Sequence, residues 1–184
     1  MTPFVRHLIA AAVLTITILG CTLSEASPSV QAAPLRGEAR DAEFTLVIHS
    51  PQAIWSAAEE ITVQAELSYT GTSQELAIGG AIGGVIAFSV EEVTGDRRMD
   101  AVRDAACARY TIGPDRPITS PYIKSGGINP GEPNEAFYRE FFDDPLFRLP
   151  TGTWRVTAWA ALAIGPDCGG RQVDLRAPLL ITVQ

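Results

Sequence analysis

Apolar and polar residues alternate most regularly between positions 61 and 69, where the chain reads ITVQAELSY. Because the side chains of a strand point alternately to its two faces, this pattern predicts a strand with one buried and one solvated face. The run 85–93 (VIAFSVEEV) alternates in the same way. Further apolar or β-branched runs are predicted as strands: 44–48, 107–112, 154–164 and 179–183.

Turn residues recur between these runs, and no amphipathic helical stripe exceeds about ten residues. We therefore predict an all-β fold, an antiparallel β-sandwich of about seven to eight strands. One short helix is predicted over 134–142, with Asn134 as its cap and Phe137 and Phe141 one turn apart. We expect this helix to lie over an open end of the sandwich, because one helix face cannot hide all its aromatics.

The segment 149–158 (LPTGTWRVTA) resembles the aromatic corner near the C-terminus of immunoglobulin-like and fibronectin-type-III-like domains. The spacing of the predicted strands is also similar to bacterial Ig-like domains, including the intracellular proteinase inhibitor type. This resemblance implies an Ig-like sandwich and leaves function open. Trp154 takes the place of the corner tyrosine and carries no hydroxyl, so the hydrogen bond of that hydroxyl is not expected here.

The N-terminus reads MTPFVRHLIAAAVLTITILGC, a short basic region followed by an apolar run of about a dozen residues. Such a run is too short for a transmembrane helix, which needs about 20 residues. The ending ILGC resembles the lipobox of bacterial lipoproteins. That resemblance implies cleavage before Cys21, lipidation of its thiol, and a protein held on the extracytoplasmic side of the cell membrane. The alternatives are a plain signal peptide cut after Ala26 or Ala33, or a retained anchor helix.

Three parts of the chain follow from these patterns. We predict a lipoprotein signal peptide at 1–20, a disordered lipid-anchored tether at 21–41, and the Ig-like domain at 42–184. The tether is rich in Ala, Ser and Pro and has no apolar period. Within the domain, 113–150 is predicted as a long inter-strand insertion, because it contains seven prolines and four glycines and departs from the strand pattern.

The chain is acidic, with 14 Lys and Arg against 21 Asp and Glu among 184 residues, a formal net charge of −7. A nucleic-acid partner is not expected, since such binders need clustered positive charge. Removal of 1–20 would take away one arginine and no acid, which makes the net charge −8.

Cys107 and Cys168 remain once Cys21 is assigned to the lipid. An even pair in an exported protein predicts a disulfide. Free thiols and a redox or metal role are the alternatives, although the chain has no CxxC motif.

No catalytic constellation emerges from the sequence. His49 follows a strand and has no nucleophile-elbow motif near it. The glycine-rich run 78–85 lacks the GK[ST] ending of a phosphate loop and is predicted as a structural loop or bulged strand. The acidic cluster of Glu140, Asp143 and Asp144 lacks the spacing of a calcium loop. We therefore expect no cofactor, no metal and no enzymatic activity.

The insertion 113–150 is the first candidate for recognition, because loops on a rigid scaffold carry most binding. The glycine-rich run is the second candidate. The opposing interpretation is that the aromatics of the insertion only plug the sandwich. The candidate binding residues are Tyr122, Lys124, Phe137, Tyr138, Phe141 and Phe142.

The leading hypothesis is a non-catalytic, surface-tethered module that binds a protein or a cell-envelope component. A proteinase-inhibitor-like or chaperone-like Ig module is the alternative, and a hydrolase that uses acidic residues is the third possibility.

Overall fold

The alternating segments form the paired strands of the first sheet. In a computed structural model, residues 34–165 and 167–184 are described and belong to one compact unit. β2 (Phe44–Ser50) and β4 (Gln64–Tyr69) pair antiparallel at its centre, with Leu46 opposite Leu67. β1 (Leu35–Arg40) and β9 (Ile118–Pro121) complete the order β1-β2-β4-β9.

The second sheet is built around two long strands, β10 (Gly152–Ile164) and β11 (Arg171–Val183). The short β3 (Ile54–Trp55) runs parallel to the end of β11, and every other described pair is antiparallel. The far side of β10 pairs with two strands in turn, β6 (Ile86–Glu92) and β5 (Leu76–Ala81). The remaining strands of this sheet are β7 (Arg98–Met99), which pairs with β6, and β8 (Cys107–Ile112), which pairs with β5.

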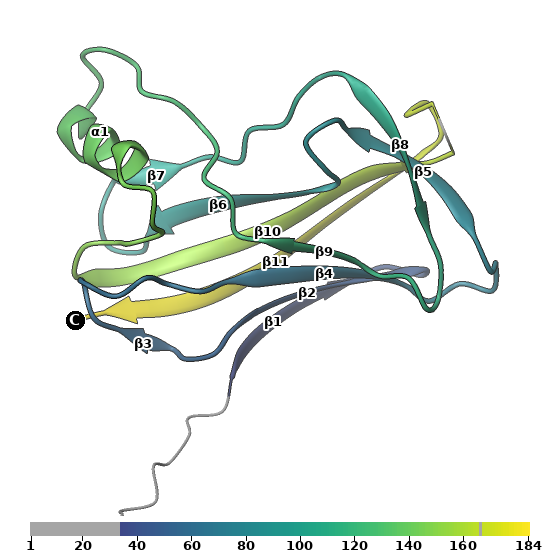
Figure 1. The fold of residues 1–184 in the computed structure, drawn as a ribbon, viewed down its shortest axis with the longest axis horizontal. Helices are drawn as coiled ribbons and strands as arrows, with labels where there is room; N and C mark the ends of the chain where they lie inside the picture. The colour runs from purple at the N-terminus through teal and green to yellow at the C-terminus, as the bar shows by residue number, and fades with distance from the viewer. Residues whose placement is uncertain (1–33, 166) are drawn as a thin grey trace, which may run out of the picture. The chain divides into compact units, whose positions relative to one another are not determined.

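The two sheets pack face to face around one apolar core (Figure 1). Alternate residues of β2 and β10 point into it, including Leu46 and Val156, which are fully buried. The predicted all-β sandwich is therefore confirmed.

The glycine-rich run lies within an interrupted strand. β5 and β6 pair with the same edge of β10. Gly79 pairs with Ala163 and Ile86 pairs with Ala160, so the residues between Gly79 and Ile86 outnumber those opposite them and form a loop. A hydrogen bond from the backbone N–H of Gly84 to the carbonyl of Ala81 closes this loop. Tyr110 secures it by donating its hydroxyl proton to the carbonyl of Ala81 at 2.6 Å. The prediction of a bulged strand agrees with this arrangement.

The described residues contain eleven strands, more than the seven to eight predicted. The additional ones are short or atypical: β3 and β7 have two residues each, and β9 has four.

β1 corrects a boundary. It lies inside 21–41, which was predicted to be a disordered tether, so the folded part begins by Leu35 rather than after residue 41. The alternation is present in LRGEAR, but glycine and alanine are weak strand residues. Gly37 is required because a Cβ at this position would collide with the carbonyl oxygen of Pro178 in β11.

The helix α1 (Glu135–Asp143) lies at one end of the sandwich, as predicted (Figure 1). It buries Tyr138 and Phe141. Asn134 occupies the N-cap position with φ 63°, but its side chain does not cap the helix. Its amide instead donates to the carboxylate of Asp96 at 3.0 Å.

The predicted signal peptide at 1–20, Cys21 and the tether up to residue 33 lie outside the described residues. Among the helices of the described part, none is long and apolar enough to cross a membrane.

Candidate functional site

The six predicted binding residues all lie around α1, but they do not form one site. They are divided between three separate hollows at this end of the sandwich. Phe137 and Phe141 line the first, Tyr122 and Lys124 line the second, and Tyr138 lines the third, while Phe142 borders the second and third.

We name the first of these the α1 hollow. It has a volume of about 420 Å³ and lies between α1 and the segment that leads into β10. Its lining is apolar at the base and charged at the sides: Ala57, Arg97, Ala136, Phe137, Glu140, Phe141, Asp144, Arg148, Leu149 and Pro150. Eight of these ten residues come from the insertion 113–150.

Arg97 forms one charged wall of the α1 hollow. Its guanidinium lies 5.0 Å from the ring centroids of both Phe137 and Trp154 and makes two hydrogen bonds with Glu92. These bonds lower the pKa of the Glu92 carboxyl and raise the pKa of Arg97. Glu92 therefore neutralises the charge of Arg97 and fixes its guanidinium against the aromatic rings.

Arg148 forms a second charged wall and is also paired. Its Nε lies 3.0 Å from a carboxylate oxygen of Asp144, one helical turn earlier in sequence. The backbone amide of Leu146 donates to the same carboxylate at 2.8 Å. This amide, followed by Arg148, lowers the pKa of Asp144 and keeps it ionised.

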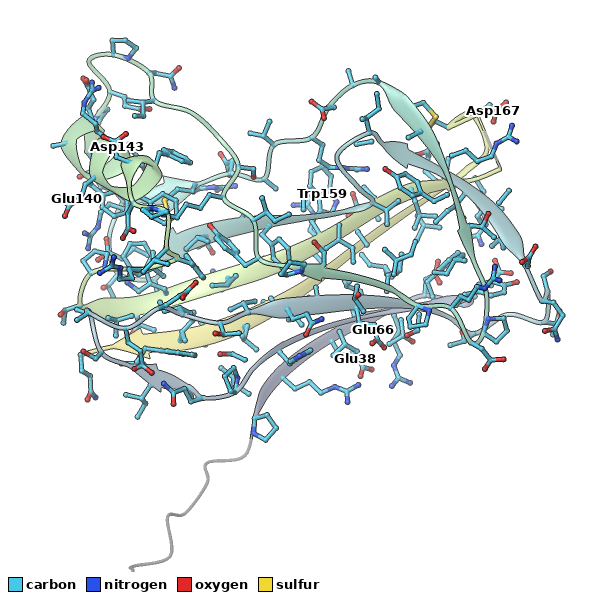
Figure 2. The ribbon with its side chains drawn as sticks, in the orientation of Figure 1. Glu38, Glu66, Glu140, Asp143, Trp159 and Asp167 are labelled. Atoms are coloured by element: carbon cyan, nitrogen blue, oxygen red, sulfur yellow. A yellow bond between two sulfur atoms is a disulfide. The ribbon has the colours of Figure 1, made fainter. Side chains whose placement is uncertain are left out.

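Glu140 differs from the other charged residues of the α1 hollow. Its side chain is exposed on α1 (Figure 2) and makes no hydrogen bond or salt bridge to any described residue. Once the two arginine pairs are accounted for, Glu140 is the unpaired charge in the lining. The α1 hollow can thus offer an apolar base and one available carboxylate.

Lys124 has a structural role that its sequence position did not suggest. Its Nζ donates to the backbone carbonyl of Asp144 at 2.6 Å and to that of Phe141, so it neutralises the C-terminal end of α1. It also lies 4.2 Å from the ring centroid of Phe141. Burial lowers the pKa of this amine.

The predicted aromatics are largely occupied with contacts inside the domain. Tyr122 stacks on Phe147 with ring centroids 3.7 Å apart, and burial raises the pKa of its phenol. Tyr138 accepts a hydrogen bond from the backbone amide of Arg98 in β7 at 3.1 Å. Tyr138 and Phe141 are buried, while the predicted site residues Phe137 and Phe142 are partly buried.

Trp154 makes a hydrogen bond at the corner where the chain enters β10, and the resemblance to Ig-like domains did not predict this bond. Trp154 is fully buried, and its indole Nε1 donates to the carbonyl of Pro150 at 2.9 Å. An indole N–H therefore supplies a hydrogen bond at the corner, and the base of the α1 hollow is held in place.

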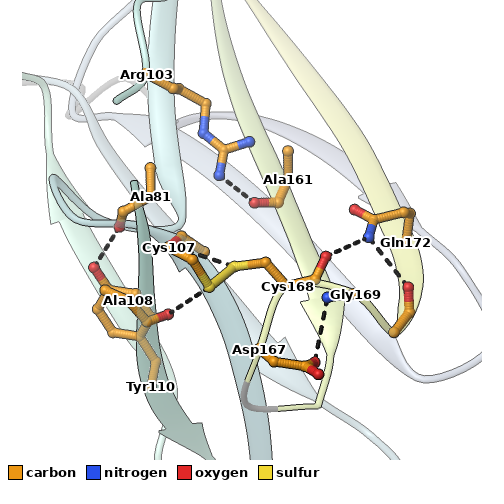
Figure 3. Close-up of a disulfide and its surroundings, with 12 residues drawn as sticks. Ala81, Arg103, Cys107, Ala108, Tyr110, Ala161, Asp167, Cys168, Gly169 and Gln172 are labelled. Atoms are coloured by element: carbon orange, nitrogen blue, oxygen red, sulfur yellow. Dashed lines mark hydrogen bonds between the residues drawn. A yellow bond between two sulfur atoms is a disulfide. The ribbon is translucent and has the colours of Figure 1, made fainter. Parts of the chain in front are cut away.

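The predicted disulfide is present (Figure 3), at the end of the sandwich opposite α1 (Figure 2). Cys107 begins β8, and Cys168 lies in the turn between β10 and β11. Their Cα atoms are 6.1 Å apart. The bridge thus ties an edge strand to the central hairpin, away from the α1 hollow.

Of the ten lining residues, only Phe137 and Phe141 were among the predicted binding residues, and three of the others show why. Arg97 belongs to a turn before β7, and Ala57 is placed by a hydrogen bond that its backbone N–H donates to the carbonyl of Gln184. Arg148 lies in the insertion, but a lone arginine after a Pro-Leu-Phe segment has no distinguishing pattern.

The described residues contain no group of three or more His, Cys, Asp or Glu side chains that could hold a metal ion. Neither a comparison with protein-family models nor a comparison with curated proteins finds a match for this chain.

Proposed function

We propose that this protein is a lipoprotein held at the extracytoplasmic face of the cell membrane, and that its β-sandwich is a non-catalytic module that binds a protein or cell-envelope component. The observation that carries the binding role is the α1 hollow. It is an open apolar recess built mainly by the insertion and placed on a rigid two-sheet scaffold.

The charged groups of the α1 hollow favour binding over catalysis. General acid–base or nucleophilic chemistry needs two or more groups within reach of one reacting centre. Here both arginines are paired with carboxylates, and Asp144, the other carboxylate of the lining, is held by Arg148 and the amide of Leu146, which leaves Glu140 alone unpaired. Such a set can hold a ligand but supplies no proton relay.

The tether would bring this end of the sandwich close to the membrane. Leu35 pairs with Ser50, from which the chain continues to β3 at the end where α1 lies. If Cys21 carries the lipid, the 14 residues up to Leu35 span at most about 50 Å. The partner of the α1 hollow would therefore be met near the membrane surface.

Lipidation is tested by expressing the full chain in a bacterial host with and without globomycin. We expect globomycin to cause an unprocessed precursor to accumulate, and we expect labelled palmitate to enter the protein but not a Cys21→Ala variant. Unchanged processing together with no palmitate incorporation would refute the lipid anchor.

The binding role is tested by photo-crosslinking in whole cells, in which the crosslinked products of the wild type are compared with those of Ala136→Arg. This substitution places a long side chain at the mouth of the α1 hollow. Ala136 is exposed on α1, so the fold should tolerate the change. The matched control is Ala77→Arg, the same substitution at the exposed residue of β5, at the opposite end. We expect crosslinked products to disappear only with Ala136→Arg, and equal products from both variants would reject the site.

A further inference from the structure

We infer that the α1 hollow recognises a cationic apolar polypeptide segment, in which a lysine or arginine is flanked by apolar residues. This inference rests on the proposed binding role and adds the chemistry of the ligand. It is carried by one unpaired carboxylate placed beside an aromatic and aliphatic base.

The base of the α1 hollow suits apolar side chains. Phe137 is partly buried, and Phe141 and Leu149 are 4% and 2% exposed, so these walls are set by the core rather than by the ligand. Phe137 stacks on Trp154 with ring centroids 6.0 Å apart, which fixes the ring that faces the recess. A volume of about 420 Å³ falls within the range of about 300–1,000 Å³ typical of ligand sites.

The charge of the site selects a cation. Glu140 lines the recess, is exposed, and has no partner among the described residues. On the same helix Glu135 is already paired with Arg139, and Asp143 adds a second carboxylate beyond the recess (Figure 2). A lysine or arginine of the ligand would meet Glu140, while its apolar neighbours would lie against Phe137 and Leu149.

The same charges argue against a membrane lipid as the occupant. Between 129 and 150 the chain has five acidic residues and two basic ones, so this segment carries a net charge of −3. Bacterial and other membranes that carry anionic headgroups repel such a surface. A polypeptide segment with its own positive charge fits the local field, whereas an anionic bilayer does not.

The test uses the processed protein purified from the envelope in detergent and three fluorescein-labelled, capped peptides. Their central sequences are Leu-Lys-Leu, Leu-Gln-Leu and Leu-Glu-Leu, and binding is measured by fluorescence anisotropy. A charge-assisted contact with the exposed Glu140 should make the lysine peptide bind up to about fivefold tighter than the glutamine peptide, with the glutamate peptide weakest. The preference should shrink at high salt.

Three variants localise the effect. Glu140→Gln should reduce the lysine preference to less than about twofold, whereas Asp143→Asn should leave it intact, because Asp143 is on the same helix but outside the recess. Ala136→Arg should abolish binding of all three peptides. Circular dichroism of each variant verifies that the fold is retained.

The outcomes separate this inference from the proposed function. Equal binding of the three peptides, blocked by Ala136→Arg, would overturn the cation preference while the binding role stands. No peptide binding at millimolar concentration would also overturn the inference, and the cellular crosslinking would then decide the binding role alone. Binding to phosphatidylglycerol vesicles that is lost with Ala136→Arg would assign the recess to lipid instead.

Discussion

At the residue scale, Trp154 joins the core to the candidate site. Its ring fills the sandwich beneath Phe137, and its Nε1 bonds to the carbonyl of Pro150 in the segment that enters β10. Trp154→Phe keeps an aromatic ring but removes the donor and leaves a cavity. We expect a loss of about 2–4 kcal/mol in the free energy of unfolding, measured by urea denaturation.

Trp159 provides the matched control for this substitution. It lies on the outer face of β10, partly exposed, and its Nε1 donates to the carboxylate of Asp174 at 2.9 Å. Trp159→Phe removes an equivalent bond at the surface, where water can replace it, so we expect a loss below about 1 kcal/mol. Equal losses for the two variants would contradict a special role of the corner.

Glu92 makes the stability of this end depend on pH. Because Arg97 lowers its pKa in the folded state, the pair stabilises the fold fully above the unfolded pKa of about 4.3, and this contribution is lost as the pH falls through the lower folded value. We expect Glu92→Gln to cost about 1–3 kcal/mol at pH 7 and progressively less below about pH 4, measured by urea denaturation across pH.

Glu91 is the comparison residue for that experiment. It pairs with Arg155, but on the outer face of the sheet, where both side chains are more exposed. Glu91→Gln should change stability by less than about 0.5 kcal/mol at any pH in the series. A Glu92→Gln difference that is independent of pH would show that packing, rather than charge, explains the loss.

At the element scale, the strands that sequence predicts well are those whose inward residues are large. β8 was predicted at its observed bounds, and β2 nearly so, because Phe44, Leu46 and Ile48 mark every second position. β1 was missed because its inward positions include Gly37 and Ala39. The first half of β11 was missed because Gln172, Asp174, Arg176 and Pro178 occupy its outward positions, which masks the buried Val173 and Leu175.

Within the glycine-rich run, Gly79 is required by close packing against the disulfide. A Cβ on Gly79 would lie 2.6 Å from the backbone nitrogen of Cys168 and 2.7 Å from its Sγ. Gly79→Ala must displace β5 or the Cys168 turn, so we expect a loss of about 1–3 kcal/mol in thermal or urea unfolding. Gly127→Ala, which has no heavy atom within 4 Å, should be neutral; a similar loss there would point to a general cost of alanine in loops.

The disulfide links elements that are 61 residues apart in sequence. The chain-entropy model assigns a closed loop of this length about 4 kcal/mol through its effect on the unfolded chain. We expect Cys107→Ala combined with Cys168→Ala to lose about 2–4 kcal/mol, and the wild type in reductant to unfold at the same urea concentration as this variant. Unchanged stability after reduction would mean that the bridge contributes nothing in solution.

At the scale of the whole molecule, the sequence marked the segment 113–150 but predicted neither the strand β9 within it nor the shape of the site. Clustered aromatics and prolines marked the segment, and α1 appeared where expected. What alternation cannot show is which residues meet across the fold. Arg97 reaches the α1 hollow from another turn, Ala57 from the segment after β3, and the charge balance that leaves Glu140 unpaired exists only once these pieces assemble.

The proposed lipid anchor would also orient the sandwich relative to the membrane. Since the chain enters β1 toward the α1 end, that end should lie closer to the membrane than the turn between β8 and β9. The two ends are separated by the 13 residues of β10, roughly 43 Å. We expect a dye on Asp143→Cys to transfer energy to labelled headgroups more efficiently than a dye on Asp115→Cys.

Both label sites are exposed aspartates, so each substitution removes the same charge, and the native cysteines would be occupied by the lipid and the disulfide. The measurement uses the lipidated protein reconstituted in vesicles, with the Cys21→Ala form as the unanchored control. Equal transfer from the two positions would mean that the sandwich tumbles freely on its tether, and the α1 hollow would then not be confined to partners near the membrane. Greater transfer from Asp143→Cys would place the recess where a membrane-adjacent polypeptide can reach it.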